Sequence, residues 1–234
     1  MKKSKNGCDL KSCFFCRGCL KEWIPAIAVN KKSYHVKKGE LLFKEGDPVT
    51  GIYFVYEGTV KVHKKWGTEK ELILRFAKKG DIVGHRGLGN RNEFPISATA
   101  IEPSEICFVD IDFFQSSLKV NPDFLYDLMM FFADELQVSE RKMRNLAHMS
   151  VKGRVAQALI TLQEKFGITK EGFINIVLSR QDLSSYAGTT YETVFRILND
   201  MVKEKAIRIT GKSITVANMP LLQSFTNETD ALVG

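Results

Sequence analysis

The sequence lacks a long hydrophobic run: its longest purely apolar stretch, residues 128–133, has six residues. A helix that crosses a bilayer needs about 20 apolar residues, so we expect no membrane-spanning helix and no membrane partner. No N-terminal stretch joins basic residues, an apolar segment and a small-residue cleavage site, and we therefore expect a cytoplasmic protein. Proline (6) and glycine (17) are at ordinary levels, which excludes collagen-like and low-complexity chains, and 44% hydrophobic residues can supply a core.

The basic excess is confined to one end of the chain. The net charge is +7, but residues 1–38 alone hold 10 Lys or Arg against 2 Asp or Glu. The overall charge is therefore a weak indication of nucleic-acid binding, and that function needs a specific site.

Four of the five cysteines lie within twelve residues, in the pattern C-x4-C-x2-C-x2-C, and the fifth is far away: Cys8, Cys13, Cys16, Cys19 and Cys107. A secreted disulfide scaffold would spread its cysteines along the chain. Thiols spaced this tightly fit an iron–sulfur cluster or one zinc ion, and nearby lysine and arginine favour thiolates. A basic tail with incidental cysteines and no metal is the third possibility.

Residues 34–111 carry short β-branched and aromatic runs separated by turns, with nine of the seventeen glycines between Gly39 and Gly89. This pattern predicts a small antiparallel β-barrel or sandwich. The expected strands are residues 41–43, 51–56, 59–66, 71–76, 96–101 and 105–111.

A heptad seam follows over residues 122–150 and predicts one long helix that pairs in parallel with a second copy of the chain. The alternative is that the helix packs across its own β-domain, and the apolar residues beside the seam allow it to do both. Asn121 and Pro122 are expected to start this helix as capping residue and first helical residue. The seam is broken at Ser139, and its apolar members are Leu125, Met129, Phe132, Leu136, Met143 and Leu146.

The last third predicts a helix at 151–166, a strand at 173–178, two short helices, and a hairpin of strands 206–210 and 213–217. Within residues 180–199, Ser184 is the small residue and Gly188 the turn residue that a helix-turn-helix requires. Thr190 is expected to cap the second helix. Leu183, Ala187, Val194 and Ile197 are the expected crossing contacts.

The opposite face of the second helix predicts DNA binding. Arg196 can donate to guanine and Glu192 can accept from cytosine in a major groove, and Tyr191 projects from the same side. Thr190, Thr193, Arg180 and Lys212, the last at the tip of the hairpin, are expected near phosphates. The alternative is a solvated face with one Glu192–Arg196 salt bridge.

The chain resembles the Crp/Fnr superfamily of bacterial transcription regulators over residues 34–219. The segments that carry the resemblance are KKGELLFKEGDPVTGIYFVYEGTVKV (37–62), KKGDIVG (78–84), VNPDF (120–124), VKGRVAQAL (151–159) and SRQDLSSYAGTTYETVFRIL (179–198). The resemblance implies an α+β chain with an N-terminal β-roll of the jelly-roll type, a long dimerisation helix and a C-terminal winged helix-turn-helix. It also implies that Gln181 lies near phosphates.

The implied domains are a cysteine-rich basic segment (1–30), a β-roll sensor domain (31–120), a dimerisation helix (121–150) and a winged helix-turn-helix domain (151–234). Cyclic-nucleotide-binding members carry a Glu and an Arg-Ser pair where this chain has His85 and Ile96-Ser97. We therefore expect no cAMP binding, and the candidate effector pocket is His85, Arg86 and Arg91.

The Fnr-like branch holds a [4Fe–4S] cluster with N-terminal cysteines and one β-roll cysteine, whose position is similar to that of Cys107. The resemblance thus implies sensing of oxygen, nitric oxide or redox state, with zinc or no metal as alternatives.

The leading hypothesis is a homodimeric regulator, not an enzyme, that binds a palindromic operator in double-stranded DNA and contacts RNA polymerase. The alternatives are a regulator that senses an unknown small ligand in the β-roll, and a ligand-binding module without DNA binding.

Overall fold

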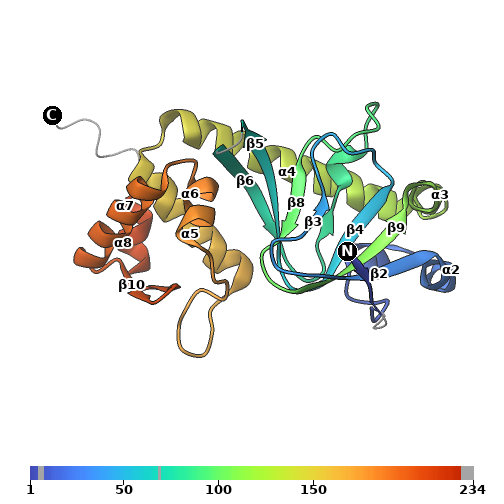
Figure 1. The fold of residues 1–234 in the computed structure, drawn as a ribbon, viewed down its shortest axis with the longest axis horizontal. Coiled ribbons are helices and arrows are strands. Elements are labelled where there is room, and N and C mark those ends of the chain that lie inside the picture. Colours follow the sequence, from blue (N-terminus) through green and yellow to red (C-terminus); the bar gives the residue numbers. More distant parts are fainter. Residues whose placement is uncertain (5–7, 68–69, 228–234) are drawn as a thin grey trace. The chain divides into compact units, whose positions relative to one another are not determined.

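The computed structural model describes residues 1–4, 8–67 and 70–227. The chain divides into two compact units, Met1–Glu135 and Leu136–Gly234. Each unit is considered by itself below, and Figure 1 labels their elements. The four-part division expected from the sequence stays a prediction. Among the described residues, no helix combines the length and apolar character needed to cross a bilayer.

Two antiparallel sheets form the β-roll of the first unit. One sheet has the strand order β1-β2-β9-β4-β7 and the other β3-β8-β5-β6. The strands are β1 (Lys2–Lys3), β2 (Lys31–Val36), β3 (Leu41–Phe43), β4 (Gly51–Glu57), β5 (Val60–Trp66), β6 (Lys70–Ala77), β7 (Ile82–Val83), β8 (Ser97–Ala100) and β9 (Ser104–Asp110). A short 3-10 turn, η2 (His85–Gly87), follows β7.

The inward side chains of these strands form an apolar core that includes Val55, Val62 and Ile106, all with almost no exposed surface. β-branched and aromatic residues dominate the strands because their side chains pack well on a pleated surface. The expected strands are confirmed with small shifts of their ends. The sequence pattern missed most of β2, whose six residues include only one buried side chain, Val36.

A second core cluster lies where the N-terminal helices meet the β-roll. It contains four of the cysteines with Phe15, Phe54, Phe114 and Phe124. The helices here are α1 (Phe14–Gly18), η1 (Lys21–Trp23), α2 (Ile24–Asn30) and α3 (Ile111–Val120). In Figure 1, α2 and α3 lie at the same end of the sheets. Helix α3 was not predicted, because its apolar residues directly continue those of β9.

The long helix α4 (Pro122–His148) is confirmed, with Pro122 as its first residue. The expected cap at Asn121 is wrong: its side-chain oxygen accepts from the backbone N–H of Leu20 at 2.7 Å. The amide therefore ties the N-terminal segment to the α3–α4 junction, instead of satisfying the first turn of α4.

The second unit holds helices α5 (Val151–Phe166), α6 (Arg180–Ala187), α7 (Tyr191–Lys203) and α8 (Met219–Ser224), with the hairpin β10 (Ile207–Thr210) and β11 (Ser213–Val216). The expected strand at 173–178 is wrong. Only the isolated bridge Ile168–Ile174 forms there, and the N–H of Ile176 donates to the carbonyl of Ile174 at 2.8 Å. That tight turn prevents a ladder, although the residues alternate as in a strand.

Candidate nucleic-acid interface and sensor region

Helices α6 and α7 form a helix-turn-helix with a cap at each step. Ser179 accepts from the N–H of Asp182 at the start of α6, and Thr190 accepts from the N–H of Thr193 at the start of α7. Gly188 ends α6 with φ 66° and ψ 48°, a left-handed conformation that costs glycine little. The predicted turn and cap are therefore confirmed, because short local rules of backbone geometry determine both.

The apolar sides of the two helices are fully packed. Every expected crossing contact is buried, as is the small residue of α6: Leu183, Ser184, Ala187, Val194 and Ile197. The guanidinium of Arg154 on α5 reinforces this packing, since it donates to the carbonyls of Ala187 at 3.1 Å and Gly188 at 3.3 Å. A half-buried arginine thus holds the turn between the helices in place.

The outward side of α7 carries an acid, a guanidinium and two aromatic rings. Glu192 and Arg196 are exposed, as are Tyr191 and Phe195. Within the described part of the chain, no hydrogen bond or ion pair engages the side chain of Glu192 or Arg196. The salt bridge that the alternative interpretation required is therefore not formed, and both groups are available to a ligand.

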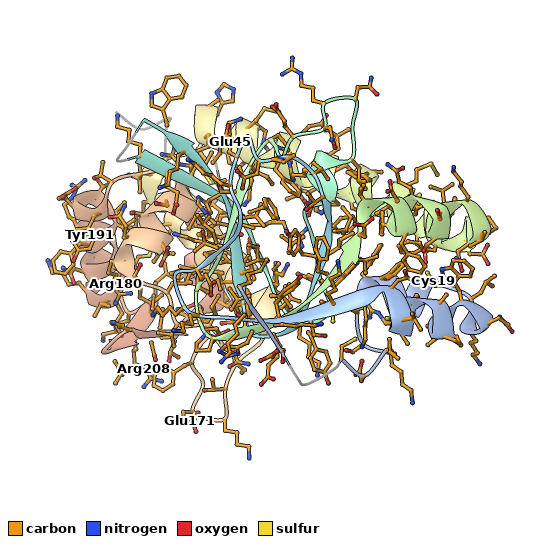
Figure 2. All side chains as sticks on the ribbon, turned by 45° about the vertical axis from the view of Figure 1, so that its right-hand side comes forward. Cys19, Glu45, Glu171, Arg180, Tyr191 and Arg208 are labelled. Carbon is orange, nitrogen blue, oxygen red and sulfur yellow. The ribbon has the colours of Figure 1, made fainter. Side chains whose placement is uncertain are left out.

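The remaining predicted DNA-contacting residues surround this helix. Arg180 opens α6, and its guanidinium reaches the carbonyl of Gly211 in the wing at 3.5 Å. Lys212 and Gln181 are exposed, and Thr190 contacts Thr193 through their hydroxyl oxygens at 3.0 Å. Figure 2 shows Arg180, Tyr191 and Arg208 along one outer side of this unit. Arg208 on β10 was not singled out from the sequence.

In the first unit, the structure brings all five cysteines into one apolar cluster. Cys13, Cys16, Cys19 and Cys107 are buried, Cys8 is half-buried, and all are free thiols. The backbone N–H of Cys16 donates to the sulfur of Cys13 at 3.4 Å, and the thiols of Cys8, Cys16 and Cys107 lie close enough to shift one another's pKa. Cys107 comes from β9, which is paired on both sides with β2 and β4. Cys107 thus shares one thiol site with four cysteines that precede it by 88 to 99 positions.

The electrostatics of this cluster single out Cys8. Hydrogen bonds from the thiols of Cys107 and Cys16, together with the ammonium of Lys31 at 2.8 Å from Cys8 Sγ, hold the pKa of Cys8 well below its usual value. By contrast, burial raises the pKa of the Cys19 thiol to about 12. Lys31 was missed in the sequence, where it is one lysine among several in a basic segment.

The cluster offers many sulfur ligands, but its side chains are not arranged around one metal ion. Among residues 1–4, 8–67 and 70–227, no three Cys, His, Asp or Glu side chains are arranged as ligands of one metal ion. The chemistry of four buried thiols and one half-buried thiol beside a lysine nevertheless suits a thiolate-bound cluster, because cationic neighbours offset its negative charge.

A second polar group lies beneath α4 in the same unit. His85 is buried, and both Arg75 and Arg86 pair with Glu135 of α4, at 3.2 and 2.9 Å. Burial and then the two guanidinium groups keep the pKa of His85 well below its ordinary value. Neither ring nitrogen of His85 has a hydrogen-bond partner among the described residues.

Of the predicted effector residues, His85 and Arg86 therefore come together, whereas Arg91 is exposed and forms no hydrogen bond or ion pair with either of them. Arg75 and Glu135 were missed; a lone arginine inside the apolar strand 72–77 was the available indication. At the phosphate-binding positions, Ile96 is apolar and buried, and the hydroxyl of Ser97 accepts from the N–H of Glu45 at 2.9 Å.

A β-roll followed by a long helix and a winged helix-turn-helix defines a DNA-binding transcription regulator with a sensor domain. Residues 34–121 match the family described as "Cyclic nucleotide-binding domain", and residues 153–225 match the "Crp-like helix-turn-helix domain". The chain belongs to the Crp/Fnr family of transcription regulators.

Curated relatives agree with this assignment. The chain is similar to the "cAMP-activated global transcriptional regulator CRP" of Salmonella typhimurium, with 33% identity over 180 residues, 75% of this chain and 84% of the relative. It is 28% identical over 204 residues to the "Anaerobic regulatory protein" of Pasteurella multocida, covering 85% and 74%. Among solved structures, FixK2 from Bradyrhizobium japonicum shares the fold with a TM-score of 0.76, 23% identity and coverage of 84% and 98%.

Proposed function

We propose that this protein is a homodimeric, sequence-specific regulator that binds a palindromic operator in double-stranded DNA. The observation that carries the proposal is the exposed, unengaged pair Glu192 and Arg196 on a helix fixed by a buried scaffold. Arg196 would donate to guanine and Glu192 would accept from cytosine, with Tyr191 beside them. Phosphates would be held by Arg180, Gln181, Thr190, Thr193 and Lys212.

The apolar seam of α4 supports pairing with a second copy. Leu125, Met129, Leu136, Met143 and Leu146 are each 40–63% exposed, and Phe132 is half-buried. A heptad row of large apolar side chains is costly in water and favours a coiled coil. Two recognition helices would then enter successive major grooves about one helical turn apart. Analytical ultracentrifugation should give a dimer, and Leu136→Glu with Met143→Glu should give a monomer.

Selection of bound fragments from random duplex DNA tests the DNA-binding proposal. We expect an enriched palindrome, binding that weakens steeply with salt, and a loss of about 1–3 kcal/mol for Arg196→Ala with relaxed preference at one base pair. Arg141→Ala, which removes an exposed arginine of α4, is the control. No enriched palindrome would favour a ligand-binding module without DNA binding.

For the sensor, we propose that Cys8, Cys13, Cys16 and Cys107 hold a [4Fe–4S] cluster and that Cys19 is not a ligand. The support is that these four thiols lie in one apolar cluster and shift one another's pKa, whereas the pKa of Cys19 is raised mainly by burial. When bound, such a cluster would supply redox chemistry sensitive to oxygen or nitric oxide. The similarity to a regulator named for anaerobic regulation agrees with this.

Anaerobic purification followed by iron, zinc and sulfide analysis tests the sensor. We expect about four irons per chain and broad absorption that bleaches in air, both lost in Cys107→Ala and retained in Cys19→Ala. Stoichiometric zinc, or no metal, would refute the cluster. Loss of iron in Cys19→Ala would refute the choice of ligands.

We further propose that the β-roll does not use cAMP as its effector. Ile96 provides no positive charge for a cyclic phosphate, and His85 replaces a ribose-binding carboxylate. His85, Arg86 and Arg91 remain the proposed pocket for an unidentified ligand. Calorimetric titration with cAMP should show no binding. Because the proposed targets are chromosomal DNA and RNA polymerase, we propose that the protein acts in the cytoplasm and is not an enzyme.

A further inference from the structure

The recognition helix α7 exposes two aromatic rings that its core does not need. Tyr191 is 45% exposed and Phe195 53% exposed, whereas Val194, Ile197, Leu198 and Met201 of the same helix are at most 6% exposed. The helix therefore completes its packing with its other face. Tyr191 and Phe195 are therefore large apolar side chains that remain exposed beside Glu192 and Arg196.

The two rings are four residues apart, so they lie on one face of α7 about one turn apart. Their separation along the helix axis is about 6 Å, close to twice the about 3.4 Å spacing of base pairs. Tyr191 is the first residue of α7, and the first turns of a recognition helix are those that contact base edges. The rings flank Glu192 and adjoin Arg196, so a duplex that engages the charged pair also meets the aromatic side chains.

The chemistry of the major groove limits what Phe195 can contact. Its ring has no hydrogen-bonding atom, and the C5-methyl group of thymine is the apolar feature of the groove. The positive side chains beside the rings, Arg196 next to Phe195 and Arg180 close to Tyr191, favour DNA over an apolar protein surface as the occupant.

We propose that Phe195, together with Tyr191, packs against thymine methyl groups in each half-site, next to the base pairs contacted by Glu192 and Arg196. The inference rests on the proposed DNA-binding function and adds a base preference to it. It assigns part of the operator specificity to apolar contact, in addition to hydrogen bonding.

The test uses the full-length protein, purified anaerobically, and the palindrome obtained by selection. Each thymine of the half-sites is replaced symmetrically by deoxyuridine, which removes only the methyl group, and affinity is measured by fluorescence anisotropy. Burying one such carbon contributes about 0.8 kcal/mol, so we expect about fourfold weaker binding per half-site and about 16-fold for the symmetric pair. Thymines outside the half-sites should show no effect.

A mutant cycle assigns the contact to the ring. In Phe195→Ala the binding should be weaker, and the deoxyuridine substitution should then have little further effect. Val202→Ala is the matched control: it shortens another exposed apolar side chain of α7, about 10 Å further along the helix. It should bind like the wild-type protein and keep the full deoxyuridine effect. Circular dichroism verifies that each variant is folded.

The outcomes separate the two proposals. If no operator is selected, the proposed function fails. If an operator is bound but no thymine is sensitive to loss of its methyl group, or Phe195→Ala keeps the full sensitivity, the inference is overturned while DNA binding stands. If Phe195→Ala binds DNA normally, the aromatic pair serves another partner and the inference is equally refuted.

Discussion

Arg154 provides a direct test of how the helix-turn-helix is held. Its guanidinium donates to three backbone carbonyls, those of Met149 at 2.8 Å, Ala187 at 3.1 Å and Gly188 at 3.3 Å. Two of these acceptors lie where α6 ends and the chain turns. The substitution Arg154→Met keeps the apolar stem but removes every donor, and we predict that it destabilises the second unit.

The expected magnitude follows from these contacts. Hydrogen bonds from a charged group contribute about 1.5–3 kcal/mol each, but taking the guanidinium out of water offsets part of that gain. Partial burial disfavours the charged form of Arg154, as the lowering of its pKa indicates, so this desolvation cost applies here. We expect a net loss of about 2–4 kcal/mol in the free energy of unfolding, or about 30- to 900-fold in the equilibrium constant. Arg154→Lys, which keeps the charge without the fork, should lose an intermediate amount.

Two spectroscopic signals distinguish the unfolding of the first unit from that of the second. Its two tryptophans, Trp23 and Trp66, both lie in the first unit, whereas far-ultraviolet circular dichroism monitors helices in both. During urea unfolding, Arg154→Met should lower the urea concentration at the midpoint of the dichroism transition of the second unit. The midpoint of the transition monitored by tryptophan fluorescence should stay unchanged. Arg141→Met, an exposed arginine in the same unit, is the control. An unshifted transition in Arg154→Met, or an equal shift in Arg141→Met, would refute the reasoning.

Two further predictions concern the first unit. Phe124 is fully buried and its ring lies 5.3–6.0 Å from those of Phe14, Phe15 and Phe114, so Phe124→Ala should cost about 3–5 kcal/mol in the tryptophan-monitored transition. Tyr126→Ala, at an exposed site on the same helix, should cost little, and equal losses would contradict this packing. Burial opposes ionisation of Glu71, but His63 and Lys61 prevail and lower its pKa to about 2. The Glu71 carboxylate therefore stabilises the fold above pH 4.5, its ordinary value, and this contribution is lost as the pH falls toward 2. In urea unfolding at several pH values, Glu71→Gln should flatten the dependence in this window; an unchanged slope, or a similar flattening in the exposed Glu57→Gln, would count against it.

Local rules made much of the fold predictable. The heptad from Leu125 to Leu146, the αL glycine at 188 and the cap at Thr190 each depend on residues close in sequence, and each determines a local feature on its own. Residues 173–178 show the limit of such rules. Their alternation fits a strand, but a strand also needs a partner along its length. This turned segment forms only the bridge to Ile168 and isolated backbone hydrogen bonds, such as that from Ile174 to Ile214, among the described residues.

In the candidate sites, too, some residues could be predicted from the local sequence and others could not. The exposed face of α7 could be derived because helical periodicity fixes which residues share a face. The groups that support each site could not: Lys31 beside Cys8, Glu135 between Arg75 and Arg86, and Arg154 behind the turn. Each joins elements brought together only by tertiary packing, and nothing in the local sequence marks its partner.

Helix α1 has a mechanical consequence for the cysteine cluster. It starts after Cys13, carries Cys16, and packs the ring of Phe15 against Phe124 and the ring of Phe14 against Phe131, both on α4. At Gly18 even a single added carbon would meet the Phe124 ring at 2.5 Å, so the two helices touch with no slack between them. If a cluster forms on Cys13 and Cys16, a change in the bonds at their sulfur atoms would have a direct route to the first turns of α4 through these two ring contacts.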